Sequence, residues 1–109
     1  MKIKTIRDNT ILFDNGNILE STNCSFCADN YADFEYLKGE TGIYDFEFDE
    51  NLCFETADSK TGFRFGNAGG LMLFVPCYSE QNGFYTSFVD IAYKGKLMLK
   101  TDCEMVYNF

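Results

Sequence analysis

Residues 2–22 read KIKTIRDNTILFDNGNILEST, and this stretch decides the expected fold. Three short runs rich in β-branched, aliphatic and aromatic side chains are separated by turn residues. Such runs are typical of strands, which we expect over residues 2–7, 10–13 and 18–22. The second turn contains Asn15-Gly16, a dipeptide that accepts the positive φ angles of a type I′ hairpin. The chain therefore opens with strands that pair antiparallel.

Further strands are expected after this opening. Tyr44, Phe46 and Phe48 alternate with acidic residues, which predicts a half-buried strand over residues 44–49 with a negative outer face. Asn82-Gly83 is a second hairpin signal. The remaining expected strands cover residues 52–56 (the partner of 44–49), 63–65, 71–78 and 84–93 (on either side of Asn82-Gly83), and 97 onward after a turn at Lys94-Gly95-Lys96.

One helix is expected after Cys27. Tyr31, Phe34 and Leu37 recur every three residues with acidic residues between them, which places the apolar side chains on one helical face. Asp29 or Asn30 would cap its start, and Gly39 suits its end. Antiparallel strands with one short helix packed on them predict an α+β fold, mainly antiparallel β-sheet, in one compact domain over residues 1–109.

The charge of the chain is concentrated in one block. The net charge is −8, and residues 29–58 hold ten acidic residues against one base, Lys38. A field of this sign repels nucleic acid and attracts basic protein surfaces. We therefore expect no direct nucleic-acid binding and a partner with a basic surface. The polar start and the short apolar runs predict no signal peptide and no membrane span, which favours a reducing cytoplasm.

Cys24 and Cys27 are the one pair of reactive side chains at a spacing that metal sites use. Two thiolates three positions apart can both reach one zinc ion at about 2.3 Å. The chain has no histidine, so thiolates would supply most of the ligands. We expect structural zinc held by Cys24, Cys27, Cys53 and Cys77, with Cys103 or a carboxylate such as Asp29 as the alternative ligand.

Two other interpretations of the cysteines remain open. Free cysteine is among the most buried residue types, so the thiols are also consistent with inert core positions. The third interpretation is a redox pair at Cys24 and Cys27. A thioredoxin-type pair begins a helix in a parallel βαβ unit, which this pattern does not predict.

The acidic block has a catalytic and a docking interpretation. Carboxylates on the solvent face of a strand lack the burial that tunes a general acid or base, so a solvated face or a docking surface is favoured. We expect the partner to be bound by Asp33, Glu35, Asp45, Glu47, Asp49 and Glu50. The aromatic cluster Tyr78, Phe84, Tyr85 and Phe88 is typical of a core but also suits a binding patch.

Two stretches resemble a family of uncharacterised domains in small phage and bacterial proteins. Residues 78–89, YSEQNGFYTSFV, resemble that family's "SNGYYS…V" hairpin. Residues 11–27, together with Tyr31-Ala-Asp-Phe34, resemble its earlier half, where an "F.DG" strand leads into "H..DCCE.V". Here no histidine is present, and Cys24 lies near the place where the family carries His or Asp. The resemblance brings no established activity with it.

In style the chain also resembles anti-CRISPR proteins, some of which carry structural zinc. That resemblance implies a non-enzymatic phage protein that inhibits a type II RNA-guided nuclease in the cytoplasm of the infected host, through an acidic surface that meets a basic channel. The alternatives are a small metal-dependent or thiol redox enzyme built on Cys24 and Cys27, and a phage structural or regulatory module.

Overall fold

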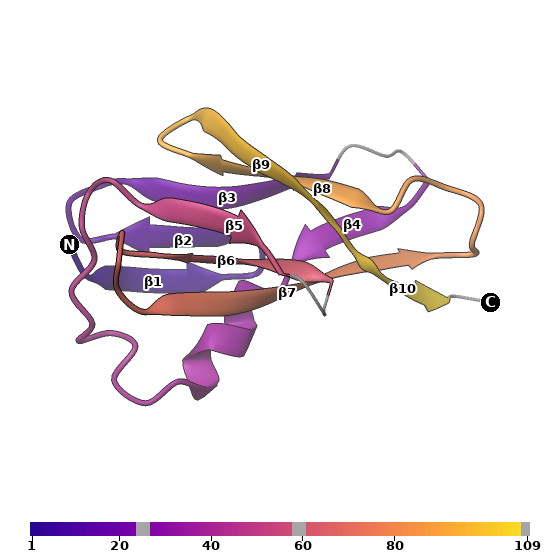
Figure 1. The fold of residues 1–109 in the computed structure, drawn as a ribbon. Coiled ribbons are helices and arrows are strands. Elements are labelled where there is room, and N and C mark those ends of the chain that lie inside the picture. The colour runs from indigo at the N-terminus through magenta and orange to yellow at the C-terminus, as the bar shows by residue number, and fades with distance from the viewer. Residues whose placement is uncertain (24–26, 58–60, 108–109) are drawn as a thin grey trace.

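The computed structural model describes residues 1–23, 27–57 and 61–107, and their strands form two sheets (Figure 1). The first sheet has the order β1-β2-β3-β8-β9, and the second has β10-β7-β6-β5, with β4 also paired to β7. The first sheet contains β1 (Ile3–Arg7), β2 (Thr10–Phe13), β3 (Ile18–Asn23), β8 (Phe88–Tyr93) and β9 (Lys96–Asp102). The second contains β4 (Asp29–Ala32), β5 (Cys53–Thr56), β6 (Gly62–Gly66), β7 (Met72–Gln81) and β10 (Glu104–Tyr107).

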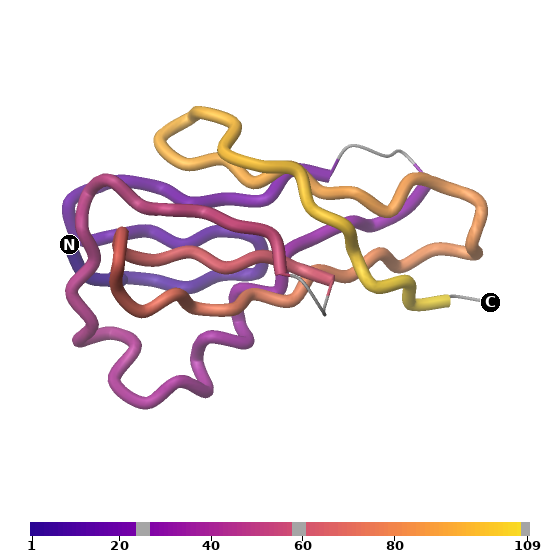
Figure 2. Tube along the Cα trace, viewed as in Figure 1, coloured from indigo at the N-terminus to yellow at the C-terminus, as the bar shows by residue number. Residues whose placement is uncertain are grey.

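Within the described residues, every strand pair is antiparallel except one. β10 runs parallel to the second half of β7, because the chain crosses from the first sheet to the second at Cys103, between β9 and β10. Figure 2 shows this diagonal descent of the chain towards its C-terminal end. The mainly antiparallel β-sheet expected from the sequence is confirmed.

The turn chemistry of the sequence explains the local hairpins. The β2–β3 turn places Gly16 at φ +91°, as its Asn-Gly signal predicts. The β8–β9 hairpin turns at Lys94 and Gly95, whose φ angles are +56° and +76°. Positive φ at both central residues is the requirement of a type I′ turn. The opening β1–β2–β3 meander is confirmed in both its pairings.

The two sheets share one hydrophobic core. Phe13, Leu19 and Ile91 from the first sheet and Phe63 and Phe65 from the second are all fully buried and belong to one cluster. Each of these residues has a more exposed neighbour along its strand. The molecule is therefore a sandwich of two sheets, in which inward-facing side chains of both sheets exclude water.

The strand expected over residues 44–49 is absent, and this prediction is wrong. The segment follows tight turns and contributes single hydrogen bonds in place of a ladder, such as the Phe48 amide donating to the Met1 carbonyl at 2.7 Å. Phe48 is buried against Phe13 and Phe65, whereas Tyr44 is 44% exposed. The alternation arises because Phe46 and Phe48 reach into the end of the sandwich from a loop. β5 pairs with β6 instead.

The helix expected after Cys27 is a strand followed by a 3₁₀ helix. β4 covers Asp29–Ala32, so neither Asp29 nor Asn30 caps a helix. The helix η1 (Phe34–Gly39) buries Phe34 and Leu37. A spacing of three is the true period of a 3₁₀ helix, which has three residues per turn. η1 is the only helix among the described residues, and the α+β class is not confirmed.

The hairpin expected at Asn82-Gly83 is also wrong. β7 and β8 lie in different sheets, so residues 82–87 cross between the layers. The amide of Tyr85 donates to Gln81 Oε1 at 2.7 Å, and Thr86 offers its carbonyl to Asn30 Nδ2 at 2.9 Å. The second half of β7 pairs with β4 and β10, while β8 pairs with β3 and β9. β7 and β8 therefore hydrogen-bond to strands that are distant or different from the pair that a local hairpin would form, and not to each other.

Across the described residues, the structure has no helix whose length and apolarity would let it span a membrane.

Candidate functional site

The carboxylates expected to bind a partner fall into two groups. Asp33 and Glu35 lie at the start of η1, whereas the other four lie in the loop that follows η1 and packs at the end of the sandwich. These four loop residues are Asp45, Glu47, Asp49 and Glu50, and all are exposed. Because the loop is not a strand, its acids do not share the flat face that the sequence predicts.

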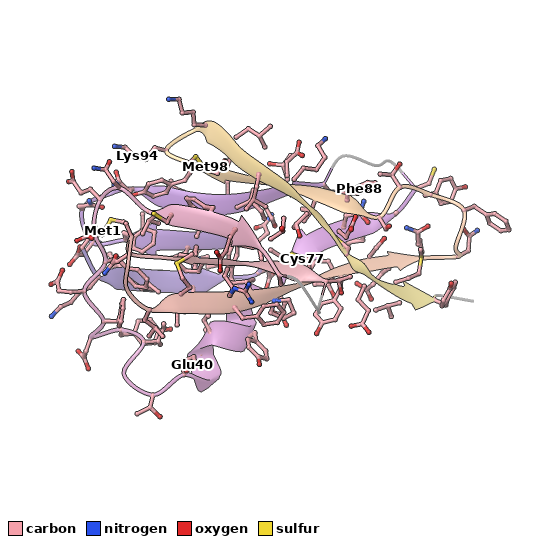
Figure 3. All side chains as sticks on the ribbon, in the orientation of Figure 1. Met1, Glu40, Cys77, Phe88, Lys94 and Met98 are labelled. Atoms are coloured by element: carbon pink, nitrogen blue, oxygen red, sulfur yellow. The ribbon has the colours of Figure 1, made fainter. Side chains whose placement is uncertain are left out.

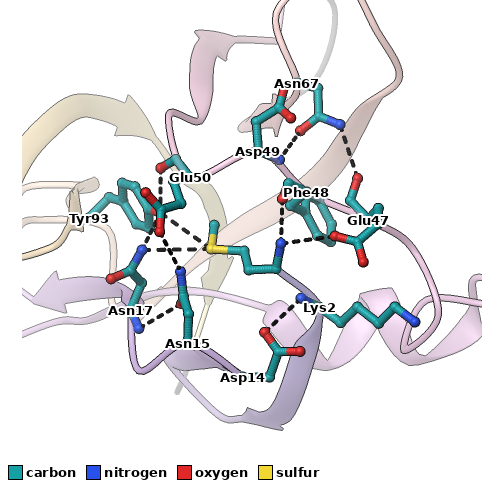
Figure 4. A network of polar contacts seen from close by, with 11 residues as sticks. Lys2, Asp14, Asn15, Asn17, Glu47, Phe48, Asp49, Glu50, Asn67 and Tyr93 are labelled. Carbon is teal, nitrogen blue, oxygen red and sulfur yellow. Dashed lines mark hydrogen bonds and ion pairs between the residues drawn. The ribbon is translucent and has the colours of Figure 1, made fainter.

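The loop acids take part in a polar network at the N-terminal residue (Figure 4). The Met1 amino group donates to Glu47 Oε2 at 3.0 Å and to the Phe48 carbonyl at 2.7 Å. Asn67 holds the loop from the other side: its Oδ1 accepts from the Asp49 amide at 2.7 Å, and its Nδ2 donates to the Glu47 carbonyl at 3.0 Å. The Tyr93 hydroxyl donates to the Glu50 carbonyl at 2.7 Å. The Glu47 carboxylate and the backbone groups of residues 47–50 therefore anchor the loop.

The second group belongs to an open hollow of about 380 Å³, which we call the acidic recess. It is built from the β1–β2 turn, the outer side of β4, the start of η1 and one residue of β7. Its lining consists of Asp8, Asn9, Asp29, Tyr31, Asp33, Glu35 and Glu80. Five of these seven side chains are carboxylates, and none is basic. The recess therefore concentrates negative charge in a concave site.

Neutralisation within the recess is limited to one member. Glu35 Oε2 forms an ion pair with Lys38 Nζ at 2.6 Å, one turn along η1. Among the described residues, no lysine or arginine forms an ion pair with Asp29, Asp33 or Glu80. The residual field acts on the recess tyrosine: burial raises the pKa of Tyr31, and the nearby carboxylates of Glu80, Asp33 and Asp29 raise it further.

Strand register places like charges side by side. Asp29 on β4 is the direct partner of Glu80 on β7, and such pairs destabilise a sheet. The next pair along is Tyr31 with Tyr78, whose ring centroids are 6.0 Å apart. On the other side of β7, Glu104 of β10 is the partner of Tyr78. Tyrosines and carboxylates therefore lie at neighbouring register positions across β4, β7 and β10.

Sequence reasoning did not place Asp8, Asp29 and Glu80 in the recess, nor Tyr31 beside them. In the structure the burial of Asp29-Asn-Tyr-Ala32 alternates as that of a strand should, but Asp29 and the buried Asn30 are both polar, so the sequence does not show this alternation. Reading these positions as a helix assigned Tyr31 to the buried face. Asp8 comes near them through tertiary structure alone, because the β1–β2 turn is distant in sequence.

The structure separates two of the four expected zinc ligands, Cys53 and Cys77. Cys53 pairs with Gly66, which pairs with Met72, while Cys77 lies five residues further along β7. At about 3.3 Å per residue, Cys53 and Cys77 are roughly 16 Å apart along the strands, too far to share one ion. Cys24 lies outside the described residues. Among the described residues, no group of three or more cysteine, aspartate or glutamate side chains is arranged to hold a metal.

The remaining thiols occupy distinct surroundings. Cys27 is exposed and lies in hydrogen-bond contact with the Tyr85 side chain. Cys77 is fully buried at the centre of the molecule (Figure 3), where a hydrogen bond with Cys103 and burial raise the pKa of its thiol. The inert-core interpretation therefore describes Cys77, and the prediction for Cys24 and Cys27 stays a prediction.

The aromatic cluster expected near residues 78–88 is divided. Tyr78 is half-buried on β7, whereas Phe84 is 84% exposed and Tyr85 and Phe88 are exposed at the β7–β8 crossing. Tyr107 of β10 reaches the same crossing, because a Cβ atom on Gly83 would lie 2.9 Å from its Cε1. An exposed aromatic tip therefore adjoins the strands that carry Glu80 and Glu104.

Comparison of this chain with protein-family models, with curated proteins and with solved structures finds no match.

Proposed function

We propose that this chain is a non-enzymatic inhibitor that binds a basic surface of a host defence protein through the acidic recess. The first candidate partner is the nuclease of a type II CRISPR system, in the cytoplasm of an infected bacterium. The observation that carries the proposal is a concave site with five carboxylates, of which only Glu35 forms an ion pair among the described residues. The sequence resemblance to anti-CRISPR proteins supports the choice of partner.

Physical reasoning supports docking at the recess more than at the loop. Asp29 and Glu80 stand on paired strands, and Asp33 and Glu35 stand at the start of η1, so the backbone places these four carboxylates before any partner arrives. Preorganised charge binds with less entropic cost, whereas in the loop the Glu47 carboxylate is already paired with the Met1 amino group. Channels that hold nucleic acid are positive, so an acidic recess is complementary to such a channel. Inhibition would then be stoichiometric.

A charge-matched pair of variants tests the proposal. The recess variant carries Asp29→Asn, Asp33→Asn and Glu80→Gln, and the control carries Asp45→Asn, Asp49→Asn and Glu50→Gln. Both change the net charge equally. We expect the recess variant to bind a type II nuclease at least about tenfold more weakly, and the control to stay within about twofold.

Binding and inhibition are measured together at rising ionic strength. We expect the affinity of the unmodified chain to fall steeply with salt, because exposed charges are screened beyond the Debye length of about 8 Å at physiological ionic strength. Equal losses in the two variants would show that total charge matters and the recess does not. Absence of binding to any type II nuclease would overturn the choice of partner.

We further propose that Cys24 and Cys27 hold a structural zinc ion, with ligands other than Cys53 and Cys77. The nearest carboxylate along the chain is Asp29, two residues beyond Cys27. Measuring zinc per chain on the purified protein and on Cys24→Ser tests this: we expect one ion per chain, lost in the variant. A Cys53→Ser variant is the control and should keep its metal. Zinc-free wild-type protein would contradict the proposal.

A further inference from the structure

The outer side of the β4, β7 and β10 strands carries tyrosines and carboxylates in two adjoining rows, which we call the tyrosine–carboxylate face. One row is Tyr31, Tyr78 and Glu104, and the next is Asp29, Glu80 and Val106. All six side chains are partly or fully exposed, whereas the alternate residues of β7 in this region are buried. The face is therefore presented outward by strands whose other side builds the core.

The first half of β7 differs from the second. Tyr36 of η1 packs on Phe74 with ring centroids 6.1 Å apart, so the 3₁₀ helix contacts the outer side of that half. Tyr78 and Glu80 lie beyond this contact. Burial and the charges of Asp33 and Glu104 raise the pKa of Tyr78. Its phenol ring therefore stands in a negative field that comes from β10 and from the start of η1.

Rings surrounded by carboxylates favour one kind of ligand. A cation binds over the face of an aromatic ring when it lies within about 6 Å of the centroid. Neighbouring strands are about 4.8 Å apart and alternate residues about 7 Å, so a cation over Tyr78 lies near both Glu104 and Glu80. A planar guanidinium stacks on a ring and donates several hydrogen bonds at its edge, whereas an ammonium is a compact, strongly hydrated charge.

We propose that the tyrosine–carboxylate face binds arginine side chains of a protein partner, with a guanidinium stacked on Tyr78 and donating to Glu80 and Glu104. This inference rests on the proposed function and deepens it, because it names the residue type that the basic partner presents. Charge complementarity identifies the occupant: the rows contain three carboxylates and no base. The like-charged pair Asp29–Glu80 lowers its own repulsion when a cation lies beside it.

The test uses the whole chain and two synthetic peptides, without any nuclease. One peptide alternates arginine with glycine, and the other alternates lysine with glycine at the same length and charge. We expect the arginine peptide to bind about three- to fivefold more tightly at low salt, the ratio that an exposed cation–π contact provides. Chemical-shift changes should appear at the rings of Tyr31 and Tyr78.

Ring variants separate stacking from general attraction. We expect Tyr78→Leu to lower the arginine affinity to that of lysine, and Tyr78→Phe to keep the preference because the ring face remains. Tyr44→Leu, on the exposed loop, is the matched control and should change neither affinity. If Tyr78→Leu fails to fold, the Asp29→Asn, Glu80→Gln variant replaces it and should lose binding of both peptides.

Equal affinities for the two peptides, or an equal effect of Tyr44→Leu, would overturn the arginine proposal. These outcomes are distinct from failure of the proposed function. If nuclease binding depends on the recess carboxylates but the two peptides bind equally, the docking proposal stands and the arginine-stacking proposal is wrong. If the arginine peptide binds more tightly but no nuclease binds, the arginine proposal for the tyrosine–carboxylate face stands and the choice of the nuclease as partner is wrong.

Discussion

At the scale of single residues, the most informative feature is the register pair Asp29 and Glu80. Two carboxylates placed directly opposite each other on neighbouring strands repel, and no ion pair within the described residues compensates either one. A sheet selected for stability alone would place a lysine at one of these positions. Under the proposed function, the pair represents stability given up at the docking site, which is the usual relation between binding surfaces and the folds that carry them.

Removing one charge of this pair should stabilise the protein. We expect Glu80→Gln to raise the free energy of unfolding by about 0.2–1 kcal/mol, because the repulsion with Asp29 disappears and the amide oxygen can still accept a hydrogen bond from Tyr31. Urea denaturation measures the change. Glu20→Gln is a matched control, since half-buried Glu20 on β3 pairs with Thr10 and Ala92, and its stability should not rise. A destabilised Glu80→Gln would contradict the reading of the pair.

The buried thiol of Cys77 gives the protein a pH dependence. Its pKa is raised above its ordinary value of 9.0 by the hydrogen bond with Cys103 and by burial. The unfolded chain therefore loses this proton at a lower pH than the folded chain. Above about pH 9 the unfolded state binds fewer protons, so stability falls as the pH rises.

Denaturation at several pH values between 8 and 10.5 should show this loss. The raised pKa values of Tyr31 and Tyr78 act in the same direction above their ordinary value of 10.0. Cys77→Ala should show a shallower decline between pH 8 and 10, because it removes a thiol that loses its proton in this range when the chain is unfolded but keeps it when the chain is folded. An unchanged slope in this variant would mean that the tyrosines account for the whole effect.

At the scale of elements, the sequence predicts structure where pairing is local and fails where it is not. The β1–β2–β3 meander and the β8–β9 turn follow from turn dipeptides and alternation. The Asn82-Gly83 dipeptide wrongly predicts a β7–β8 hairpin. In the structure β8 pairs with β3 and β9, and the second half of β7 pairs with β4 and β10. Residue spacing alone does not report such partners.

The candidate site was predictable only in part, for a related reason. Asp33 and Glu35 follow from the acidic block, and both line the recess. Asp8 and Glu80 enter it through folding, from segments far from that block. The spacing of three between Phe34 and Leu37 correctly predicted a helix, but the helix is a 3₁₀ helix and not an α-helix. The alternation of Phe46 and Phe48 reported burial without a strand, because a loop can insert aromatic rings into a core as a strand does.

The loop after η1 offers a test of this account. We expect Asn67→Ala to lower the free energy of unfolding by about 1–2 kcal/mol, since its amide makes the two hydrogen bonds to the backbone of Glu47 and Asp49. Chemical shifts of the Phe48 ring should change as the loop loosens. Asn51→Ala, an exposed position in the same loop, is the control and should leave both unchanged. Retained stability in Asn67→Ala would show that Phe48 alone anchors the loop.

At the scale of the whole molecule, the chain passes between the sheets repeatedly. β3 lies in the first sheet and β4 in the second, β7 returns the chain to β8, and Cys103 links β9 to β10. Such a topology joins residues far apart in sequence, as in the β3–β8 ladder that pairs Leu19 with Tyr93. Long loops must therefore close before the central ladders can form.

This topology predicts slow folding for a chain of 109 residues. We expect refolding from urea on a time scale of about milliseconds to seconds, the range of β-rich domains dominated by non-local pairing. Stopped-flow fluorescence of the tyrosines measures the rate. A change at the local β8–β9 hairpin, such as Gly95→Ala at φ +76°, should destabilise the protein. Refolding in microseconds would indicate that local contacts dominate.

β7 contributes both to the interior and to the tyrosine–carboxylate face. Its residues 73, 75, 77 and 79 face the interior, whereas Tyr78 and Glu80 face outward. If the chain is the inhibitor that we propose, we expect the odd-numbered positions to keep their size and apolar or small character in a lineage that changes hosts, while 78 and 80 diversify together with β4 and β10. Selection for packing of the interior and selection for binding to a changing partner would thus act on alternate residues of the same ten-residue strand.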